Sequence, residues 1–411
     1  MLGKSSAVLA AFVVVVVTVC GLTVASSTRP LVAAPSSVDA PIEMAARTPV
    51  GEQIVLSFSG DTILGTDDTF AAESGLPAVW ERSGRAPDHF FRNVRHLFTA
   101  DDLTVGNVEV AFTRSREKRY KGEGEVYHFH GDPALAHTLP AGGFDVATVA
   151  NNHTFDYGQT GFDDTLAALA DAGIGVFGTG YEGEGSGYDL ILVRKVKGVT
   201  FGFVGYQAWT DGPEMVGRIH RDFARLRAAG AQVIIPYFHW GDESEHLPNP
   251  VQTNLAHIAV DAGADLVVGT HPHVIQSMEV YRGKLIAYSF GNFAFGGNSN
   301  PSDKRALILQ TRFTAVDGSV RDVGFRVIPT RVSSTEAFND YAPTPYRDGE
   351  KRDVLGFVNS LSPTLGDGST TCSCRLCRRR SRPRCPGLPR PDETAGPLAG
   401  MPCPGARPRL R

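Results

Sequence analysis

The sequence predicts a layered α/β fold with a mixed β-sheet. Short apolar runs alternate with segments of helical spacing, and two pairs of runs turn back at Lys197-Gly198 and Asp317-Gly318. Several of these runs end on His, Asn, Asp or Gly. Because ligands of open α/β sheets bind outside the carboxyl ends of strands, this pattern predicts a site along one sheet edge.

The elements follow from the local pattern. Predicted strands are apolar runs that stop at polar or Gly residues: 53–59, 102–105, 144–149, 190–196, 200–206, 233–238, 265–269, 284–290, 306–316 and 320–329. Predicted helices are 90–99, 160–172, 219–229 and 251–262. In the second of these, Phe162, Leu166 and Leu169 share one side, and Gly173 supplies a stop signal. The charged, Gly-containing segment 115–125 is expected to be a loop.

The two ends of the chain differ from its middle. Lys4 precedes an apolar run from Ala7 to Ala25, which predicts a secretory signal or an uncleaved signal anchor. The domains expected from these shifts in composition are a signal segment at 1–25, a linker at 26–50, a main domain at 51–335, an extension at 336–366 and a disordered Arg-, Pro- and Cys-rich tail at 367–411.

Composition limits the kinds of partner. The 411 residues are 42% hydrophobic and 20% charged, as in a globular protein. From Gly368 onward there are ten Arg and two acidic residues, so the tail carries about +8 and the rest of the chain about −12. An acidic body argues against nucleic acid as a partner and is compatible with a bound cation. Between Cys20 and Cys372 there is no cysteine, so a metal there must be held by oxygen and nitrogen.

Polar clusters at the strand ends carry the expected chemistry. They contain Gly60-Asp61, Asn107-Val108-Glu109, Asn151-Asn152-His153, His239-Trp240-Gly241-Asp242-Glu243, His271-Pro272-His273 and Gly291-Asn292-Phe293. Carboxylate, carboxamide and imidazole together suit Mn²⁺, Fe or Zn²⁺ better than Mg²⁺. The sequence therefore predicts a divalent metal site with one or two ions, which can activate a water.

These clusters, with the surrounding Ala150 to Gly158, Gly269 to Gln276 and Tyr288 to Phe293, resemble the motif series of the CapA family of capsule (poly-γ-glutamate) synthesis proteins. Order and spacing agree from about Ile54 to Pro329. The resemblance implies the fold of calcineurin-like metallophosphoesterases, a four-layered α/β/β/α sandwich with mixed sheets and a metal centre at the sheet edge.

The resemblance also implies roles for single residues. His153 is the expected catalytic, non-ligand histidine, and Asp156 is expected to orient it. The expected metal ligands are Asp61, Glu109, Asn152, His239, His271 and His273. Two departures stand out. The phosphoesterase pattern has His two residues after the first Asp, where this chain has Ile63, and its second carboxylate position is shared here by Asn107 and Glu109.

Four further residues are expected to bind substrate, namely Asn107, Trp240, Glu243 and Asn292. Three of them have a plainer alternative in the sequence. Trp240 can pack in the core, Glu243 can be a solvated surface acid, and Gly291-Asn292 can form a turn.

The resemblance favours an extracytoplasmic protein, secreted or anchored, of poly-γ-glutamate or capsule-type polymer synthesis or export, with a metal-dependent, hydrolase-like active site. Its expected partners are an anionic polymer or peptide and a membrane polymer-synthase complex. Three alternatives use the same scaffold: a metal-dependent phosphoesterase, a peptide epimerase in which His153 moves an α-proton, and a non-catalytic binding protein.

Overall fold

The structure, a computed structural model, describes residues 51–124, 126–178 and 190–365. The predicted signal segment, linker and Arg-rich tail lie outside the described residues. Among the helices of these ranges, none is both long and apolar enough to cross a membrane.

The larger sheet has the strand order β16-β15-β14-β1-β2-β5-β6, and β13 also pairs with β1. Strands β1, β2, β5 and β6 run parallel, whereas β14, β15 and β16 continue the sheet in antiparallel fashion. The bounds are β1 Glu52–Ile63, β2 Leu103–Val108, β5 Val146–Thr148, β6 Gly175–Phe177, β13 Asn292–Phe295, β14 Arg305–Val316, β15 Ser319–Arg331 and β16 Thr344–Pro345.

The second sheet has the order β11-β12-β10-β9-β8-β7. Its four central strands are parallel, and β7 and β11 are antiparallel edge strands. The bounds are β7 Ile191–Val196, β8 Val199–Gln207, β9 Val233–His239, β10 Leu266–Thr270, β11 Met278–Tyr281 and β12 Lys284–Ala287. A separate two-stranded ladder joins β3 Ala111–Phe112 to β4 His130–Gly131.

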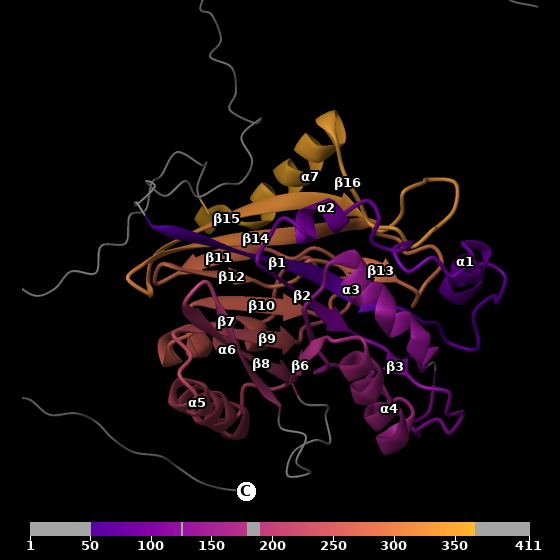
Figure 1. Cartoon of the computed structure of the whole chain (residues 1–411), viewed down its shortest axis with the longest axis horizontal. Helices are drawn as coiled ribbons and strands as arrows, with labels where there is room; N and C mark the ends of the chain where they lie inside the picture. Colours follow the sequence, from indigo (N-terminus) through magenta and orange to yellow (C-terminus); the bar gives the residue numbers. More distant parts are fainter. Residues whose placement is uncertain (1–50, 125, 179–189, 366–411) are drawn as a thin grey trace, which may run out of the picture. The chain divides into compact units, whose positions relative to one another are not determined.

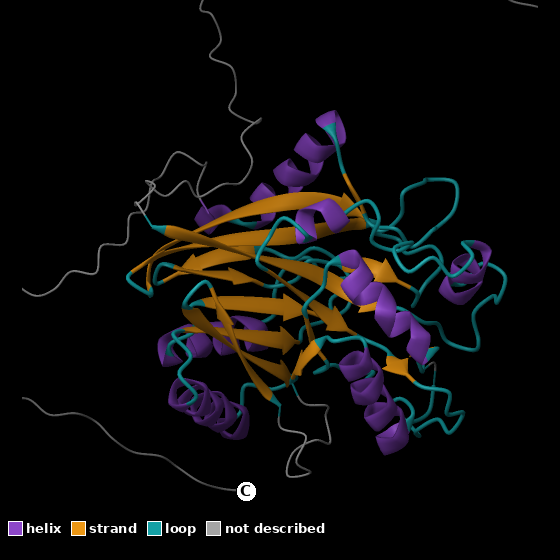
Figure 2. Ribbon diagram, viewed as in Figure 1, coloured by secondary structure: helices purple, strands orange, loops and turns teal. Residues whose placement is uncertain are grey.

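The two sheets pack face to face with helices outside them, which confirms the predicted four layers (Figures 1 and 2). One apolar cluster fills the space between the sheets, a second joins the larger sheet to α1–α4, and a third joins the smaller sheet to α5 and α6. The helices are α1 Leu76–Arg82, α2 Arg95–Phe98, η1 Pro133–His137, α3 Thr138–Gly142, α4 Gly158–Asp171, α5 Pro213–Ala228, α6 Pro250–Ala262, α7 Asp348–Leu361 and η2 Pro363–Leu365.

Most predicted elements are present, with one clear error. The predicted helix 90–99 is largely a series of turns, and only its last part forms α2. Phe90 and Phe91 are fully buried in the second cluster, so their spacing reflects packing of a turn against the sheet. Sequence patterns also did not predict α1, β6, β11, β13 or α7, most of which are short.

Local sequence signals explain the ends of several elements. Asn249 and Gln252 form a reciprocal capping box at the start of α6, and Gly263 ends this helix at φ 108°. The two predicted hairpins turn at Lys197-Gly198 and Asp317-Gly318, where all four residues have positive φ. This is the geometry that matches the twist of tight β-hairpins.

Helix α7 lies in the segment 336–366, which the sequence predicted to be an extension outside the main domain. Val354, Leu355 and Val358 nevertheless belong to the cluster between the sheets, and Met278 N–H donates to Ser362 Oγ at 2.8 Å. The helix therefore contributes to the same core as the sheets.

Leu355→Ala should lower the free energy of unfolding by about 2–5 kcal/mol, because it removes buried methyl groups from that core. Urea unfolding measures the loss. The exposed Asn359→Ala of the same helix should change stability by less than about 0.5 kcal/mol. Equal effects of the two changes would show that α7 does not support the sandwich.

Candidate metal centre

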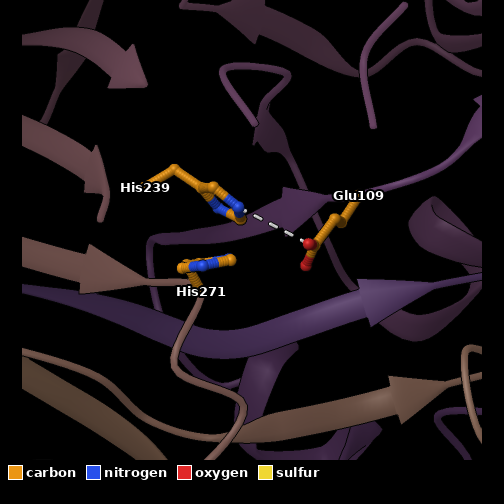
Figure 3. A group of neighbouring side chains, drawn as sticks. All are labelled: Glu109, His239 and His271. Carbon is orange, nitrogen blue, oxygen red and sulfur yellow. Dashed lines mark ion pairs between the residues drawn. The ribbon is translucent and has the colours of Figure 1, made fainter. Parts of the chain in front are cut away.

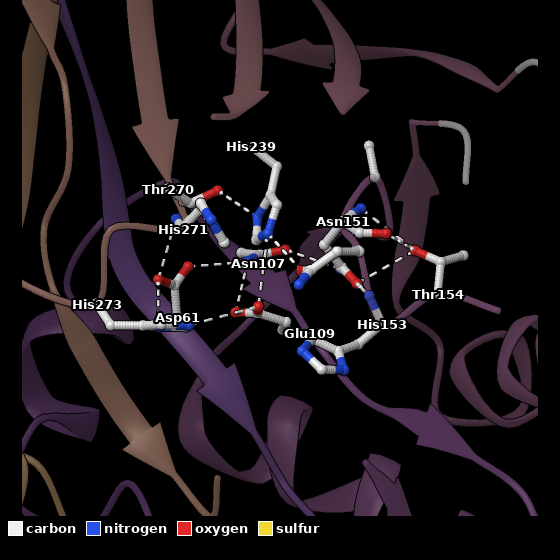
Figure 4. A network of polar contacts seen from close by, with 12 residues as sticks. Asp61, Asn107, Glu109, Asn151, His153, Thr154, His239, Thr270, His271 and His273 are labelled. Atoms are coloured by element: carbon white, nitrogen blue, oxygen red, sulfur yellow. Dashed lines mark hydrogen bonds and ion pairs between the residues drawn. The ribbon is translucent and has the colours of Figure 1, made fainter. Parts of the chain in front are cut away.

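The site lies where parallel strands of both sheets end. The larger sheet brings Asp61 on β1, Glu109 just after β2, and the turn Asn151-Asn152-His153 after β5. The smaller sheet brings His239 at the end of β9 and the turn 271–273 after β10. Figure 4 shows the side chains of Asp61, Glu109, His239, His271 and His273 converging, as the strand-end pattern predicted.

Asp61 sits in a tightly built part of the larger sheet. A Cβ on Gly60 would lie 2.0 Å from the Gly291 carbonyl oxygen, so only glycine allows β1 and the segment before β13 to approach this closely. Asp61 N–H donates to that same carbonyl at 3.0 Å. The fully buried Asp61 carboxylate accepts from the Asn107 amide at 2.9 Å and from His271 N–H at 3.1 Å.

Glu109 is the second buried carboxylate. Its side chain is 0% exposed, and its Oε2 accepts from Asn107 Nδ2 at 3.4 Å. Asn107 thus bridges the two carboxylates, and its own carbonyl accepts from Asn151 Nδ2 at 3.1 Å. The amide positions Asp61 and Glu109 relative to each other.

The histidines approach from the smaller sheet. His239 contacts Thr270 Oγ1 through Nδ1 at 3.2 Å and Asn152 Oδ1 through Nε2 at 2.8 Å. His273 Nδ1 lies 2.9 Å from Asn292 Oδ1 and 3.3 Å from Asp61 Oδ2. These contacts fix which ring nitrogen of each histidine faces the other sheet.

The backbone at the His-Pro-His turn is strained. His271 has φ 99° and His273 has φ 57°, a region that residues with a Cβ seldom occupy. Such conformations each cost on the order of 1–3 kcal/mol and persist where the surrounding structure imposes them. Here the strained turn places the imidazoles of His271 and His273 near Asp61 and Glu109.

Two buried polar atoms of the site have no hydrogen-bond partner among the described residues, namely Glu109 Oε1 and His271 Nδ1. Both belong to a group with His239 whose ligand atoms lie within 4.8 Å of one another (Figure 3). Asp61, Glu109 and His273 form a second such group, and Glu243, His271 and His273 a third. Atoms that can ligate a metal, that lie close together and that have no hydrogen-bond partner fit a divalent metal ion.

The pKa shifts of these buried groups also fit a bound cation. Burial raises the pKa of Glu109 well above its ordinary value, and the Asp61 carboxylate raises it further. Burial and neighbouring histidines lower the pKa values of His239 and His271 well below the ordinary value, which keeps both imidazoles neutral. Burial alone would lower the pKa of His273, but Glu109 and Asp61 raise it to about 9. A bound cation would relieve the repulsion between the two carboxylates.

Beside this cluster lies the pair His153 and Asp156. His153 Nδ1 lies 2.7 Å from Asp156 Oδ2, so the carboxylate can orient the ring. The same carboxylate accepts from Phe129 N–H at 2.7 Å and from Lys121 Nζ at 2.6 Å. Burial would raise the pKa of Asp156, but His153 and Lys121 together lower it. Burial lowers the pKa of His153.

The residues that were expected to bind substrate lie in different surroundings. Trp240 does not line the site: it is 0% exposed, stacks on Phe238 in the third cluster and donates from Nε1 to the Tyr288 carbonyl at 3.0 Å. Asn107 is equally buried, and its carboxamide is committed to its neighbours. The structure thus places Trp240 in the core, on the opposite face from the neighbouring His239, and places Asn107 in the site with its carboxamide engaged by other residues of the site.

Asn292 and Glu243 relate to the site in different ways. Asn292 is buried and contacts His273, so it positions a candidate ligand. Glu243 is exposed on the loop that follows β9. Ile63, at the position where the resemblance implies a histidine, is fully buried in the apolar cluster beneath α1–α4.

Three residues of the site had no role assigned to them from the sequence. Lys121 comes from the charged loop and contacts Asp156. Asn151 ties the turn after β5 to Asn107 and to the Val108 carbonyl. Trp209 is 38% exposed and lies edge-on to His271, with ring centroids 4.7 Å apart. Its exposure beside a buried imidazole is visible only in three dimensions.

Comparison with known proteins identifies the family. The sequence model described as "Bacterial capsule synthesis protein PGA_cap" matches residues 55–297. The chain belongs to this family. The match includes every predicted metal ligand and the His153–Asp156 pair.

Curated relatives carry related names. The chain is 34% identical over 263 residues to the PGA biosynthesis protein CapA of Bacillus subtilis, covering 61% of this chain and 66% of that protein. It is 28% identical over 272 residues to the capsule biosynthesis protein CapA of Bacillus anthracis, covering 62% and 63%. A probable polyglutamine synthesis accessory protein of Mycobacterium tuberculosis is 30% identical over 269 residues, covering 57% and 67%. The chain thus spans somewhat under two thirds of each Bacillus protein.

Among solved structures, a hypothetical protein from Thermus thermophilus aligns with a TM-score of 0.39 at 18% identity. The alignment covers 67% of this chain and 99% of that one.

Lys121→Met should lower the free energy of unfolding by about 1.5–3 kcal/mol, because it removes a charged hydrogen bond from the buried Asp156 carboxylate. Lys118→Met on the same loop breaks only a half-exposed ion pair with Asp68, 3.1 Å long. That change should cost about 1 kcal/mol or less. Urea unfolding of both variants tests the difference. If Lys118→Met proves as harmful as Lys121→Met, the loop is not anchored through Asp156.

Proposed function

We propose that this chain is an extracytoplasmic protein of polyglutamate- or capsule-type polymer synthesis or export, and that it acts through a metal-dependent, hydrolase-like site. The family match and the names of the Bacillus relatives support the polymer class. The apolar run at 7–25 supports export, with the protein either secreted or anchored. The observation that carries the metal-dependent part is the buried set of ligand-type atoms around Glu109.

Six side chains would hold the metal, namely Asp61, Glu109, Asn152, His239, His271 and His273. Glu109 belongs to two of the ligand groups, so the residues present would suffice for one or two ions. The mixture of carboxylate and imidazole favours Mn²⁺, Fe or Zn²⁺. When bound, such ions polarise an acyl or phosphoryl oxygen and activate water.

The protein's own groups supply proton transfer. Asp156 holds His153 through Nδ1, which leaves Nε2 as the nitrogen that exchanges a proton with a substrate. The low pKa of this buried imidazole favours its neutral form, the one that accepts a proton as a general base. A carboxylate-oriented histidine beside a metal cluster supports catalysis rather than binding alone.

A complementation experiment tests the polymer function. Deleting the gene should reduce surface polymer, and the wild-type gene should restore it. His153→Ala and His271→Ala should both fail to restore it although the proteins accumulate normally. The exposed change Asn359→Ala should restore it fully. Surface polymer that is unchanged by the deletion would refute this function.

The same arrangement favours a second candidate, a phosphoester hydrolase, because Asn152, His239 and His271 match the ligands implied by the phosphoesterase resemblance. Purified protein with Mn²⁺ should then hydrolyse members of a phosphoester panel, and His153→Ala should lower kcat by about 10²–10⁴-fold. No hydrolysis by the metal-loaded wild type would exclude this candidate and leave the polymer function standing.

Metal binding should weaken as the pH falls. Ionised Glu109 helps to raise the pKa of His273 to about 9, and burial raises the pKa of Glu109, so the two groups as a pair hold one or more protons at neutral pH. A metal binds only the neutral imidazole and the ionised carboxylate, so these protons must leave. The apparent affinity for Mn²⁺ should fall about tenfold per pH unit for each proton released, from about pH 8.5 down to about 6.5. Calorimetry in buffers of different ionisation enthalpy counts the protons, and an affinity independent of pH would contradict the assignment.

A further inference from the structure

The metal position beside Asp61 lacks one ligand of the phosphoesterase pattern. Residue 63, where that pattern has histidine, is Ile63, and its side chain is buried in the apolar cluster between the larger sheet and α1–α4. The described groups leave Asp61, Glu109 and His273 at this position. Three protein ligands with a fourth position open are a common arrangement for catalytic ions, but the missing histidine changes the ligand set.

Glu243 lies on the exposed side of the same cluster. Its carboxylate forms a ligand group with His271 and His273, in which the ligand atoms lie within 4.8 Å of one another. His273 also belongs to the group of Asp61, and His271 to the group of His239. Glu243 is therefore within ligand spacing of one histidine from each metal position, and it approaches from an exposed loop whereas Glu109 is buried.

The loop that carries Glu243 is fixed on the C-terminal side of this residue. Ser244 N–H donates to the Pro272 carbonyl at 2.9 Å, which ties the loop to the His-Pro-His turn. Gln276 Nε2 donates to the Glu245 carbonyl at 2.9 Å. Ser244 has φ 66°, a left-handed conformation that costs free energy in a residue with a Cβ. The placement of Glu243 is thus imposed by the structure and is not that of a free surface acid.

The neighbouring acids behave differently. Asp242 accepts from Asn249 Nδ2 at 2.9 Å and so belongs to the start of α6. Glu245 belongs to no ligand group among the described residues. Of the three acids in this loop, Glu243 alone forms a ligand group with the histidines.

We infer that Glu243 is a metal ligand that replaces the histidine missing at position 63. This inference rests on the proposed metal centre. The exchange of an imidazole for a carboxylate gives the centre three carboxylates, from Asp61, Glu109 and Glu243. An oxygen-rich set of this kind shifts preference from Zn²⁺ toward Mn²⁺ or Fe²⁺.

Metal titration of the purified full chain tests the inference with a readout that does not depend on activity. The metal-free wild type, Glu243→Gln and Glu245→Gln are titrated with Mn²⁺ alone, and bound ions per chain are counted by electron paramagnetic resonance of free Mn²⁺. Glu245→Gln is the matched control, since it removes the same charge from the same exposed loop. The visible spectra of the Co²⁺-loaded proteins report on the ligand set itself.

Glu243→Gln should bind one of the Mn²⁺ ions at least about tenfold more weakly than the wild type and should change the Co²⁺ spectrum, whereas Glu245→Gln should do neither. Equal binding by Glu243→Gln and wild type would overturn the inference while leaving the metal centre intact. Equal weakening by both variants would also overturn it, because loop charge would then explain the effect. A wild type that binds neither Mn²⁺ nor Co²⁺ would refute the metal centre itself and this inference with it.

Discussion

The burial of two carboxylates at one point, Asp61 and Glu109, is the constraint on which the rest of the site depends. In the part of the chain that the structure describes, neither forms an ion pair with Lys or Arg, and the basic side chains beside them are His239, which is neutral, and His273. An uncompensated buried charge costs several kcal/mol, so an arrangement of this kind persists only with a counter-charge. Protons supply it in the metal-free protein, as the raised pKa values of Glu109 and His273 indicate.

Several features of the surrounding structure that hold these groups together lower the stability of the fold. His271 and His273 occupy left-handed backbone conformations, and Gly60 is needed because the backbone of Gly291 lies against it. Asn107, which bridges the carboxylates, uses its whole amide for positioning. Strain and buried polar groups that serve no packing purpose are expected at a functional site, since a stability optimum would remove them.

How far the sequence predicted this site depends on what each residue does. Strand ends are readable from apolar runs, so His239 and the His-Pro-His turn were found, and the family motifs added the separation of Asn152 from His153. Trp240 lies in the core, the plainer of the two alternatives that the sequence offered, because a residue next to His239 on a strand faces the opposite side. Lys121 was missed because its contact with Asp156 crosses 35 residues of chain through an irregular loop, and no periodic pattern reports such a contact.

The two sheets contribute complementary halves of the centre. The larger sheet supplies the buried carboxylates, Asn152 and the His153–Asp156 pair, whereas the smaller sheet supplies the three candidate ligand histidines. Of the two ligand groups that contain Glu109, one combines this acid with two histidines of the smaller sheet, and the other combines Glu109 and Asp61 with one. Binding a cation in either group would therefore stabilise the closed sandwich over any state in which the sheets separate, so metal affinity and fold stability are linked quantities. The two carboxylates would then have opposite effects in the two states: their ionisation opposes folding without a cation and would favour folding with one bound.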